Sequence, residues 1–176
     1  MPRRVPKAPP SLPEVKLEKP EEEKEEEKSE LFEEKVIQID RVAYVMAGGK
    51  RLRFRAVVVV GNKAGKVGVG VAKAVGIPDA IAKAKTQAKK RLIDIPLKNG
   101  TIPFEIREKY GSALILLKPA SPGTGIIAGG PIRAVAEVAG ITDLLSKILG
   151  SKNKINNVMA VYEALKKLKE YETSRT

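Results

Sequence analysis

The chain has 176 residues, with 33 lysines and arginines against 21 aspartates and glutamates and a formal net charge of +12. It contains no cysteine and no histidine, which removes disulfides, thiolate and imidazole metal ligands, and the usual general base of neutral pH. The composition therefore argues against an enzyme, and we expect no metal and no cofactor.

No apolar run approaches the roughly 20 residues of a membrane span, and the N-terminus lacks the apolar segment of a signal peptide. We expect a soluble, cytoplasmic protein with no membrane partner.

The charge is distributed unevenly along the chain. Residues 1–34 hold seven cations and eleven glutamates, whereas the remaining residues hold 26 cations and 10 anions. Within that basic body, residues 35–98 alone carry 15 basic and 3 acidic residues. Such a concentration of cations in one half of a protein is typical of nucleic-acid binding.

The first 34 residues form a low-complexity segment. Six prolines lie between positions 2 and 20, and Glu21–Glu27 is almost entirely charged. A segment of this kind cannot bury enough apolar surface to offset its ordering entropy. We therefore expect residues 1–34 to be a disordered, acidic and proline-rich extension.

Three strands open the basic body. Alternating apolar residues and turn-forming residues predict strands at 36–46, 51–60 and 66–72, with a glycine turn at 48–49 and a hairpin turn at 62–65. Glycines alternate with valines in the third strand, which allows another backbone to approach it closely.

A helix follows the three strands. Proline at an early helical position and Asp79 in the first turn predict that it starts within Gly76–Asp79. Apolar residues recur at steps of three and four as far as Ile95, so we expect Pro96 to end the helix. Residues 35–98 thus predict a β-β-β-α domain with one helix across a sheet.

Residues 99–172 predict a second small domain. In chain order, the pattern indicates strands within 101–110 and 113–117, a loop rich in glycine and proline at 118–131, and a helix at 131–139 that Gly140 ends. Periodicity alone leaves residues 143–149 open between helix and strand. Asn156 or Asn157 is the expected cap of a final helix.

The second strand carries a row of arginines. Arg51, Arg53 and Arg55 alternate with apolar residues, so they share one face. The segment 48–73 holds seven cations and no carboxylate, which suits phosphate contact; a solvated strand face is the alternative. The predicted contacts are Gly48, Gly49, Lys50, Arg51, Arg53, Arg55, Lys63, Lys66 and Lys73, with Lys83 and Lys90 as less specific candidates on the helix.

Aromatic residues are scarce, with three phenylalanines, four tyrosines and no tryptophan. Proteins that hold single strands usually stack bases on aromatic side chains. The scarcity predicts recognition of duplex shape and phosphates and not of splayed bases.

Glu105 and Glu108 could form a carboxylate pair. Because they lie three residues apart on a predicted strand, they point to opposite faces, and we expect no catalytic residue.

A glycine-rich loop imitates a nucleotide-binding motif. Residues 123–128 fit the dinucleotide fingerprint and follow a strand, but Gly129–Pro131 interrupts the segment where the helix should already run. What remains is a set of loop amides, including those of Thr124 and Gly125, before a helix with Arg133 in its first turn. These groups could form an anion site; a plain structural turn is the equal alternative.

Two long motifs resemble the signature of the bacterial-type small-subunit ribosomal protein five family. They are Gly49–Ala56 continuing into Val59–Gly70, and Lys118–Val135, with Gly150–Ser151 and Asn156–Asn157 as shorter matches. Motifs of this length in this order make the resemblance specific over roughly residues 33–170.

The resemblance implies an α+β fold. An N-terminal β-β-β-α domain like those that bind double-stranded RNA would precede a small two-layer α/β domain with a right-handed crossover, which favours a strand at 143–149. Family members bind small-subunit ribosomal RNA, contact ribosomal proteins four and eight, and influence decoding accuracy. The loop 46–51 matches the family loop that reaches toward the subunit head, where spectinomycin binds. The acidic N-terminal extension departs from the family pattern, and nothing transfers to it.

Two further hypotheses remain beside a structural ribosomal protein. A free-standing duplex-RNA binder, acting in regulation or as a chaperone, would show the same charge pattern. An enzyme of nucleotide or phosphate chemistry is the third.

Overall fold

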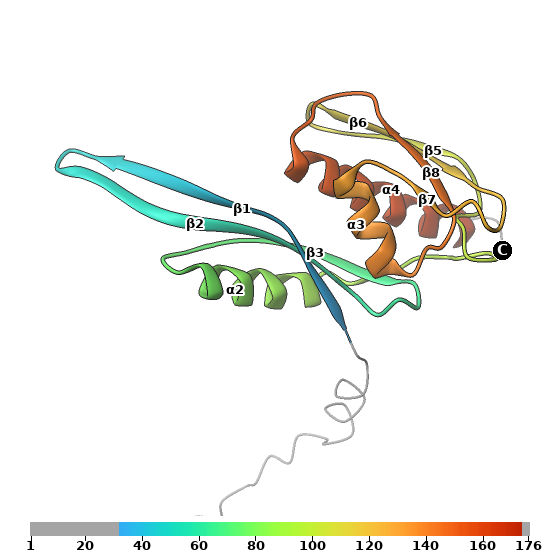
Figure 1. Cartoon of the computed structure of the whole chain (residues 1–176), viewed down its shortest axis with the longest axis horizontal. Helices are drawn as coiled ribbons and strands as arrows, with labels where there is room; N and C mark the ends of the chain where they lie inside the picture. Colours follow the sequence, from blue (N-terminus) through green and yellow to red (C-terminus); the bar gives the residue numbers. More distant parts are fainter. Residues whose placement is uncertain (1–31, 174–176) are drawn as a thin grey trace, which may run out of the picture. The chain divides into compact units, whose positions relative to one another are not determined.

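The computed structural model describes residues 32–173, which form two four-stranded sheets and three helices (Figure 1). Up to residue 31, the extension that was expected to be disordered lies outside the described residues. For Glu33 and Glu34 the expectation is wrong, because they begin β1 and pair with Gly61 and Val60 of β2. The elements in chain order are β1 (Glu33–Met46), β2 (Gly49–Gly61), β3 (Lys66–Ala74), α2 (Ile77–Lys89), β4 (Ile93–Asp94), β5 (Ile106–Tyr110), β6 (Ala113–Pro119), β7 (Ile126–Ile127), α3 (Gly130–Ala139), β8 (Leu144–Ile148) and α4 (Lys154–Thr173).

The first sheet has the order β1-β2-β3-β4, with neighbouring strands antiparallel. β1 pairs with the whole of β2, from Gly61 to Gly49, whereas β3 pairs with β2 only as far as Phe54. Residues 49–53 and their partners in β1 therefore continue as a two-stranded ribbon, which extends past β3 and α2 in Figure 1. Most residues of the ribbon are exposed, and because successive side chains of a strand point to opposite faces, both faces are open to a partner.

α2 covers one face of this sheet. The even-numbered apolar residues of β2 pack against a stripe of alanines on α2, as the alternation predicts. Gly70 makes the approach possible, because a Cβ there would lie 2.0 Å from the carbonyl oxygen of Ala84. Gly68 similarly faces Ala88, at 2.3 Å from its carbonyl oxygen. The prediction that these glycines admit another backbone is confirmed.

The second sheet has the order β5-β6-β8-β7, with β6 in its interior. β7 and β8 are parallel, and α3 connects them, which is the crossover that the resemblance implies. Residues 144–148 form a strand, so the resemblance resolved the ambiguity that periodicity left. Gly140 ends α3 at a φ of 85°, a left-handed conformation that glycine adopts without strain.

The turn between β2 and β3 joins the two halves of the fold. The Lys63 N–H donates to the carbonyl of Val138 at 3.1 Å, and the Gly65 N–H to that of Ala139 at 2.9 Å. The main hydrophobic core spans both sheets, because valines of β2 and β3 pack with apolar residues of α3 and α4. The face of β2 that carries the arginines thus becomes a core face farther along the strand.

Three predicted boundaries are wrong. α2 ends at Lys89, because Ile93 pairs with β3 and the Ile95 N–H donates to Gly65; this pairing across the sheet uses the apolar residues that seemed to continue the helix. The alternation over residues 101–110 forms a strand only from residue 106 onward. Asn153 lies before α4 and accepts the Ile155 N–H, so neither Asn156 nor Asn157 is the cap.

Candidate RNA interface

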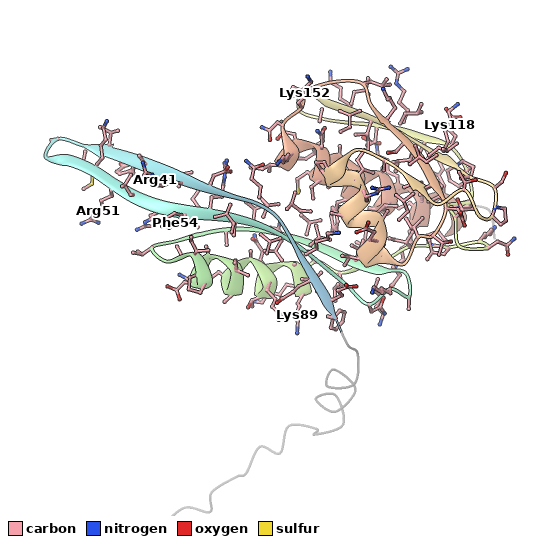
Figure 2. The ribbon with its side chains drawn as sticks, in the orientation of Figure 1. Arg41, Arg51, Phe54, Lys89, Lys118 and Lys152 are labelled. Atoms are coloured by element: carbon pink, nitrogen blue, oxygen red, sulfur yellow. The ribbon has the colours of Figure 1, made fainter. Side chains whose placement is uncertain are left out.

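Arg51 and Arg53 lie on the two-stranded ribbon, opposite residues of β1. The register pairs Arg51 with Tyr44 and Arg53 with Val42. Directly opposed residues of antiparallel strands point to the same face, so the two guanidinium groups share their face with an aromatic ring and an aliphatic side chain. Figure 2 shows Arg51 on the part of the ribbon beyond Phe54.

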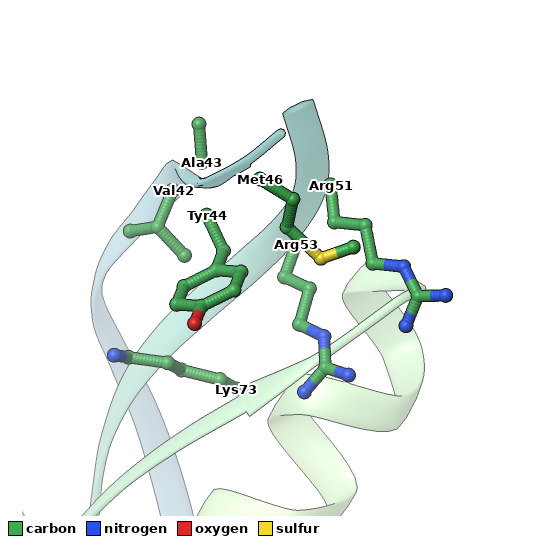
Figure 3. A pocket seen from close by; sticks show the side chains of 7 residues that line it. All are labelled: Val42, Ala43, Tyr44, Met46, Arg51, Arg53 and Lys73. Carbon is green, nitrogen blue, oxygen red and sulfur yellow. The ribbon is translucent and has the colours of Figure 1, made fainter. Parts of the chain in front are cut away.

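The same face contains a hollow of about 380 Å³ (Figure 3). Met46 extends the β1 side of this face, and Lys73 reaches it from β3, where it lies opposite Arg55. We call the residues that line the hollow the hairpin surface: Val42, Ala43, Tyr44, Met46, Arg51, Arg53 and Lys73.

The three cations of the hairpin surface are not neutralised within the described chain. Arg51, Arg53 and Lys73 are exposed, and none of them forms an ion pair with another residue between 32 and 173. Three like charges around one hollow repel each other, which a bound polyanion would relieve. The geometry therefore favours phosphate as the ligand at this surface.

Asp40 neutralises the third arginine of the row. Its carboxylate accepts hydrogen bonds from Arg55 Nε at 3.2 Å and Nη2 at 2.7 Å, and the Arg55 hydrogen bond is the main reason why the pKa of Asp40 lies below its ordinary value. The expectation of an arginine row without acidic partners is wrong for Arg55. Its charge belongs to a cross-strand pair, because Asp40 stands directly opposite in β1.

The other predicted contacts on the strands are dispersed. Gly48 and Gly49 form the exposed turn of the ribbon, and Lys50 lies opposite Val45, on the other face from Arg51. At the far end of β2 the amine of Lys63 forms an ion pair with Glu33 at 2.7 Å. Lys66 begins β3 next to the turn between β2 and β3, where its N–H donates to the side chain of Asn62.

The candidates on α2 lie on the opposite side of the sheet from the hairpin surface. Lys83 and Lys90 line a separate shallow hollow of about 400 Å³, together with Ala82, Thr86 and Gln87. Gln87 also has a structural task, because its Oε1 accepts the N–H of Val71 at 3.0 Å. The structure thus separates the predicted cations into two groups that cannot hold one phosphate together.

The glycine-rich loop binds a carboxylate of the protein itself. Asp143 is buried and accepts the Gly125 N–H at 2.8 Å. The hydroxyl of Thr124 donates to a carbonyl of its own loop at 2.7 Å, and Arg133 donates to a β7 carbonyl at 2.8 Å. These contacts favour the plain structural turn over an anion site at the Gly125 amide, and an RNA contact from Thr124 or Arg133 stays a prediction.

Asp143 should make this loop sensitive to acid. Hydrogen bonds from Gly125 and Thr142 hold the pKa of Asp143 below its ordinary value of 3.8, so its contribution is present above that value and is lost as the pH falls through the folded-state pKa. Asp143→Asn should therefore lower the free energy of unfolding most at neutral pH, and the difference from the wild type should shrink below pH 3.8. Urea unfolding between pH 7 and acid measures this. A difference that stays constant with pH would contradict it.

The described residues give no support to a catalytic centre. Glu105 pairs with Lys118 at 3.0 Å, and Glu108 pairs with Lys167 at 2.6 Å, so the two carboxylates serve separate ion pairs. Residues 32–173 contain no group of three acidic residues that could hold a metal ion. Across the same residues, no helix combines the length and apolarity of a membrane span.

Sequence reasoning missed the apolar half of the hairpin surface. Val42, Tyr44 and Met46 alternate along β1 just as the arginines alternate along β2, but the sequence does not say that these two rows share a face. The register supplies that information, because a one-residue slip would place Tyr44 on the other face.

Comparisons with known proteins agree with this fold. The family model described as Ribosomal protein S5, N-terminal domain, matches residues 32–96, and the one described as Ribosomal protein S5, C-terminal domain, matches residues 108–175. The chain is 55% identical over 139 residues to the small ribosomal subunit protein uS5 of Thermotoga neapolitana, covering 79% of this chain and 78% of the relative. It is 52% identical over 138 residues to uS5 of Thermus thermophilus, covering 78% and 85%. Together the two domain models match most of the chain, and so does each of these relatives. The chain therefore belongs to the ribosomal protein S5 family.

Proposed function

We propose that the chain is a structural component of the small ribosomal subunit that binds ribosomal RNA through the hairpin surface. The role is structural and not enzymatic. The observation that supports this interface most directly is the set of three exposed cations around one hollow. Arg51, Arg53 and Lys73 lie together without an acidic partner among residues 32–173, whereas Arg55 and Lys63 are paired within the chain.

The second sheet and its helices provide the remaining contacts in this proposal. Exposed apolar residues such as Ile127 and Leu149 lie among its charged side chains, and a mixed surface of this kind suits both RNA and protein neighbours. From the family resemblance we propose that the neighbours include ribosomal proteins four and eight. We propose the division into domains at 35–98 and 99–172 on the same basis.

The resemblance also supports a role in decoding accuracy. The exposed turn of the ribbon would then reach toward the subunit head, near the spectinomycin site, with residues 46–51 at its end. As a component of small subunits, the protein would act in the cytoplasm.

Cosedimentation tests the ribosomal assignment. Tagged full-length protein, expressed in cells and fractionated in low magnesium to separate the subunits, should be found with the small subunit. The free-standing RNA regulator carries the same charges and makes the opposite prediction. A protein found mainly in the soluble fraction, away from both subunits, would overturn the ribosomal assignment.

A further inference from the structure

An exposed tyrosine lies in the middle of the hairpin surface. The side chain of Tyr44 is 69% exposed, more than any other aromatic residue between 32 and 173. Its position on the ribbon keeps it away from both hydrophobic cores. Burial of an aromatic side chain is strongly favourable. An aromatic side chain that stays exposed to solvent beside further apolar residues therefore marks a contact surface.

The residues around Tyr44 give that surface a specific chemistry. Figure 3 shows its ring beside Arg53 and Met46, with the hydroxyl directed toward Lys73. The hollow has an aromatic wall, apolar neighbours and three cations, with no carboxylate among its lining residues. Its volume of about 380 Å³ lies within the range of small-ligand sites.

A single nucleotide matches this combination better than a duplex does. The flat face of a base stacks on an aromatic ring, and the flanking phosphates pair with arginine and lysine. Within a duplex both faces of each base are covered by its neighbours, so a duplex could use the cations but not the ring. An acidic peptide would also fit the charge, but a peptide has no need of a flat apolar wall between cations.

We propose that the hairpin surface binds one unstacked nucleotide of the RNA. The base stacks on Tyr44, and the phosphates on either side contact Arg51, Arg53 and Lys73. This inference rests on the proposed function, because the ligand is RNA in both. It changes the expectation drawn from the few aromatic residues: recognition at this surface includes a splayed base and not duplex shape alone.

Two matched RNAs test the proposal with the full-length chain. One is a short perfect duplex, and the other is the same duplex with a single bulged 2-aminopurine, whose fluorescence reports stacking. The wild type should bind the bulged RNA about tenfold more tightly than the perfect duplex, and the fluorescence should be quenched on binding. Tyr44→Leu should remove both the preference and the quenching, whereas Tyr44→Phe should keep them.

Tyr110 provides the matched control, because it is an exposed tyrosine of β5 in the other sheet. Tyr110→Leu should leave the preference for the bulged RNA unchanged. Circular dichroism and thermal unfolding of each variant verify folding, which an exposed side chain such as Tyr44 should hardly affect.

The outcomes separate this proposal from the proposed function. Equal binding of both RNAs by the wild type, or an equal loss for both in Tyr44→Leu, would refute the nucleotide site and leave the RNA interface intact. Binding of neither RNA at low salt would refute the interface itself. Displacement of both RNAs by an acidic peptide that binds more tightly would assign the hollow to a protein neighbour and overturn the proposal.

Discussion

Gly70→Ala is expected to lower the free energy of unfolding by about 3 kcal/mol, the upper part of the range for an overpacked core. A Cβ at Gly70 would lie 2.0 Å from the carbonyl oxygen of Ala84 and 2.9 Å from the backbone nitrogen of Ala88. Both atoms belong to the α2 backbone, so no side-chain rotation can relieve the clash. The helix must move away from β3, and its alanine stripe then loses contact with β2. Urea unfolding measures the loss, which is large against a typical stability of about 5–15 kcal/mol.

Gly48 provides the control for this prediction. It is exposed, a Cβ there would meet nothing within 4 Å, and its φ is not positive. Gly48→Ala should therefore change the free energy of unfolding by no more than about 0.5 kcal/mol. Similar losses in the two variants would mean that the effect reflects the backbone entropy of glycine, and the close contact between α2 and β3 would not be its cause.

Local patterns in the sequence were enough for most of the secondary structure. Alternation placed Arg51 and Arg53 on one face of a strand, and glycines in the third strand indicated the close approach of another backbone, which is that of α2. Proline and Asp79 placed the start of α2 within Gly76–Asp79, and the helix begins at Ile77. These signals succeed because each depends on residues that are neighbours in the chain, where side-chain direction follows from backbone geometry alone.

The predictions that the structure contradicts depend on contacts between residues that lie far apart in the chain. Asp40 and Arg55 meet only because the β1–β2 register brings them together. Asp143 meets Gly125 because β8 runs beside β7. A charge count cannot show either pairing, so the sequence overstated the number of cations and amides open to an anion. Ile93 leaves the helical pattern for the same reason, since its partner lies in β3.

Neutralising the three open cations of the hairpin surface should have the largest effect on RNA binding. The combined variant is Arg51→Gln, Arg53→Gln and Lys73→Gln, which keeps long polar side chains on an exposed face. If each cation neutralises one phosphate, the slope of log K against log salt should fall by about three. The same relation gives a loss of affinity of about 10²–10³-fold near 0.1 M salt. Titration of small-subunit ribosomal RNA at several salt concentrations measures both quantities.

A control with the same charge change distinguishes a site from general attraction. Lys109→Gln, Lys147→Gln and Lys152→Gln remove three exposed cations on and beside the second sheet, where Figure 2 shows Lys152. This control should weaken binding only slightly and change the slope by less than about one. Equal slopes for the two triple variants would mean that the hairpin cations belong to a solvated strand face.

Arg55→Gln tests which property makes an arginine of this row contribute to RNA binding. The property is either its position in the alternating strand or the absence of an ion pair within the folded chain. Arg55 belongs to the same row as Arg51, yet its charge is already balanced by Asp40 at 2.7 Å. Its removal leaves the partly buried Asp40 carboxylate without its charged partner and with only the Gln38 hydrogen bond. The variant should therefore lose stability, while its salt slope changes by less than that of Arg51→Gln. An equal change of slope in Arg51→Gln and Arg55→Gln would show that RNA displaces the ion pair. The alternation of the strand would then predict the interface better than the contacts of the folded chain do.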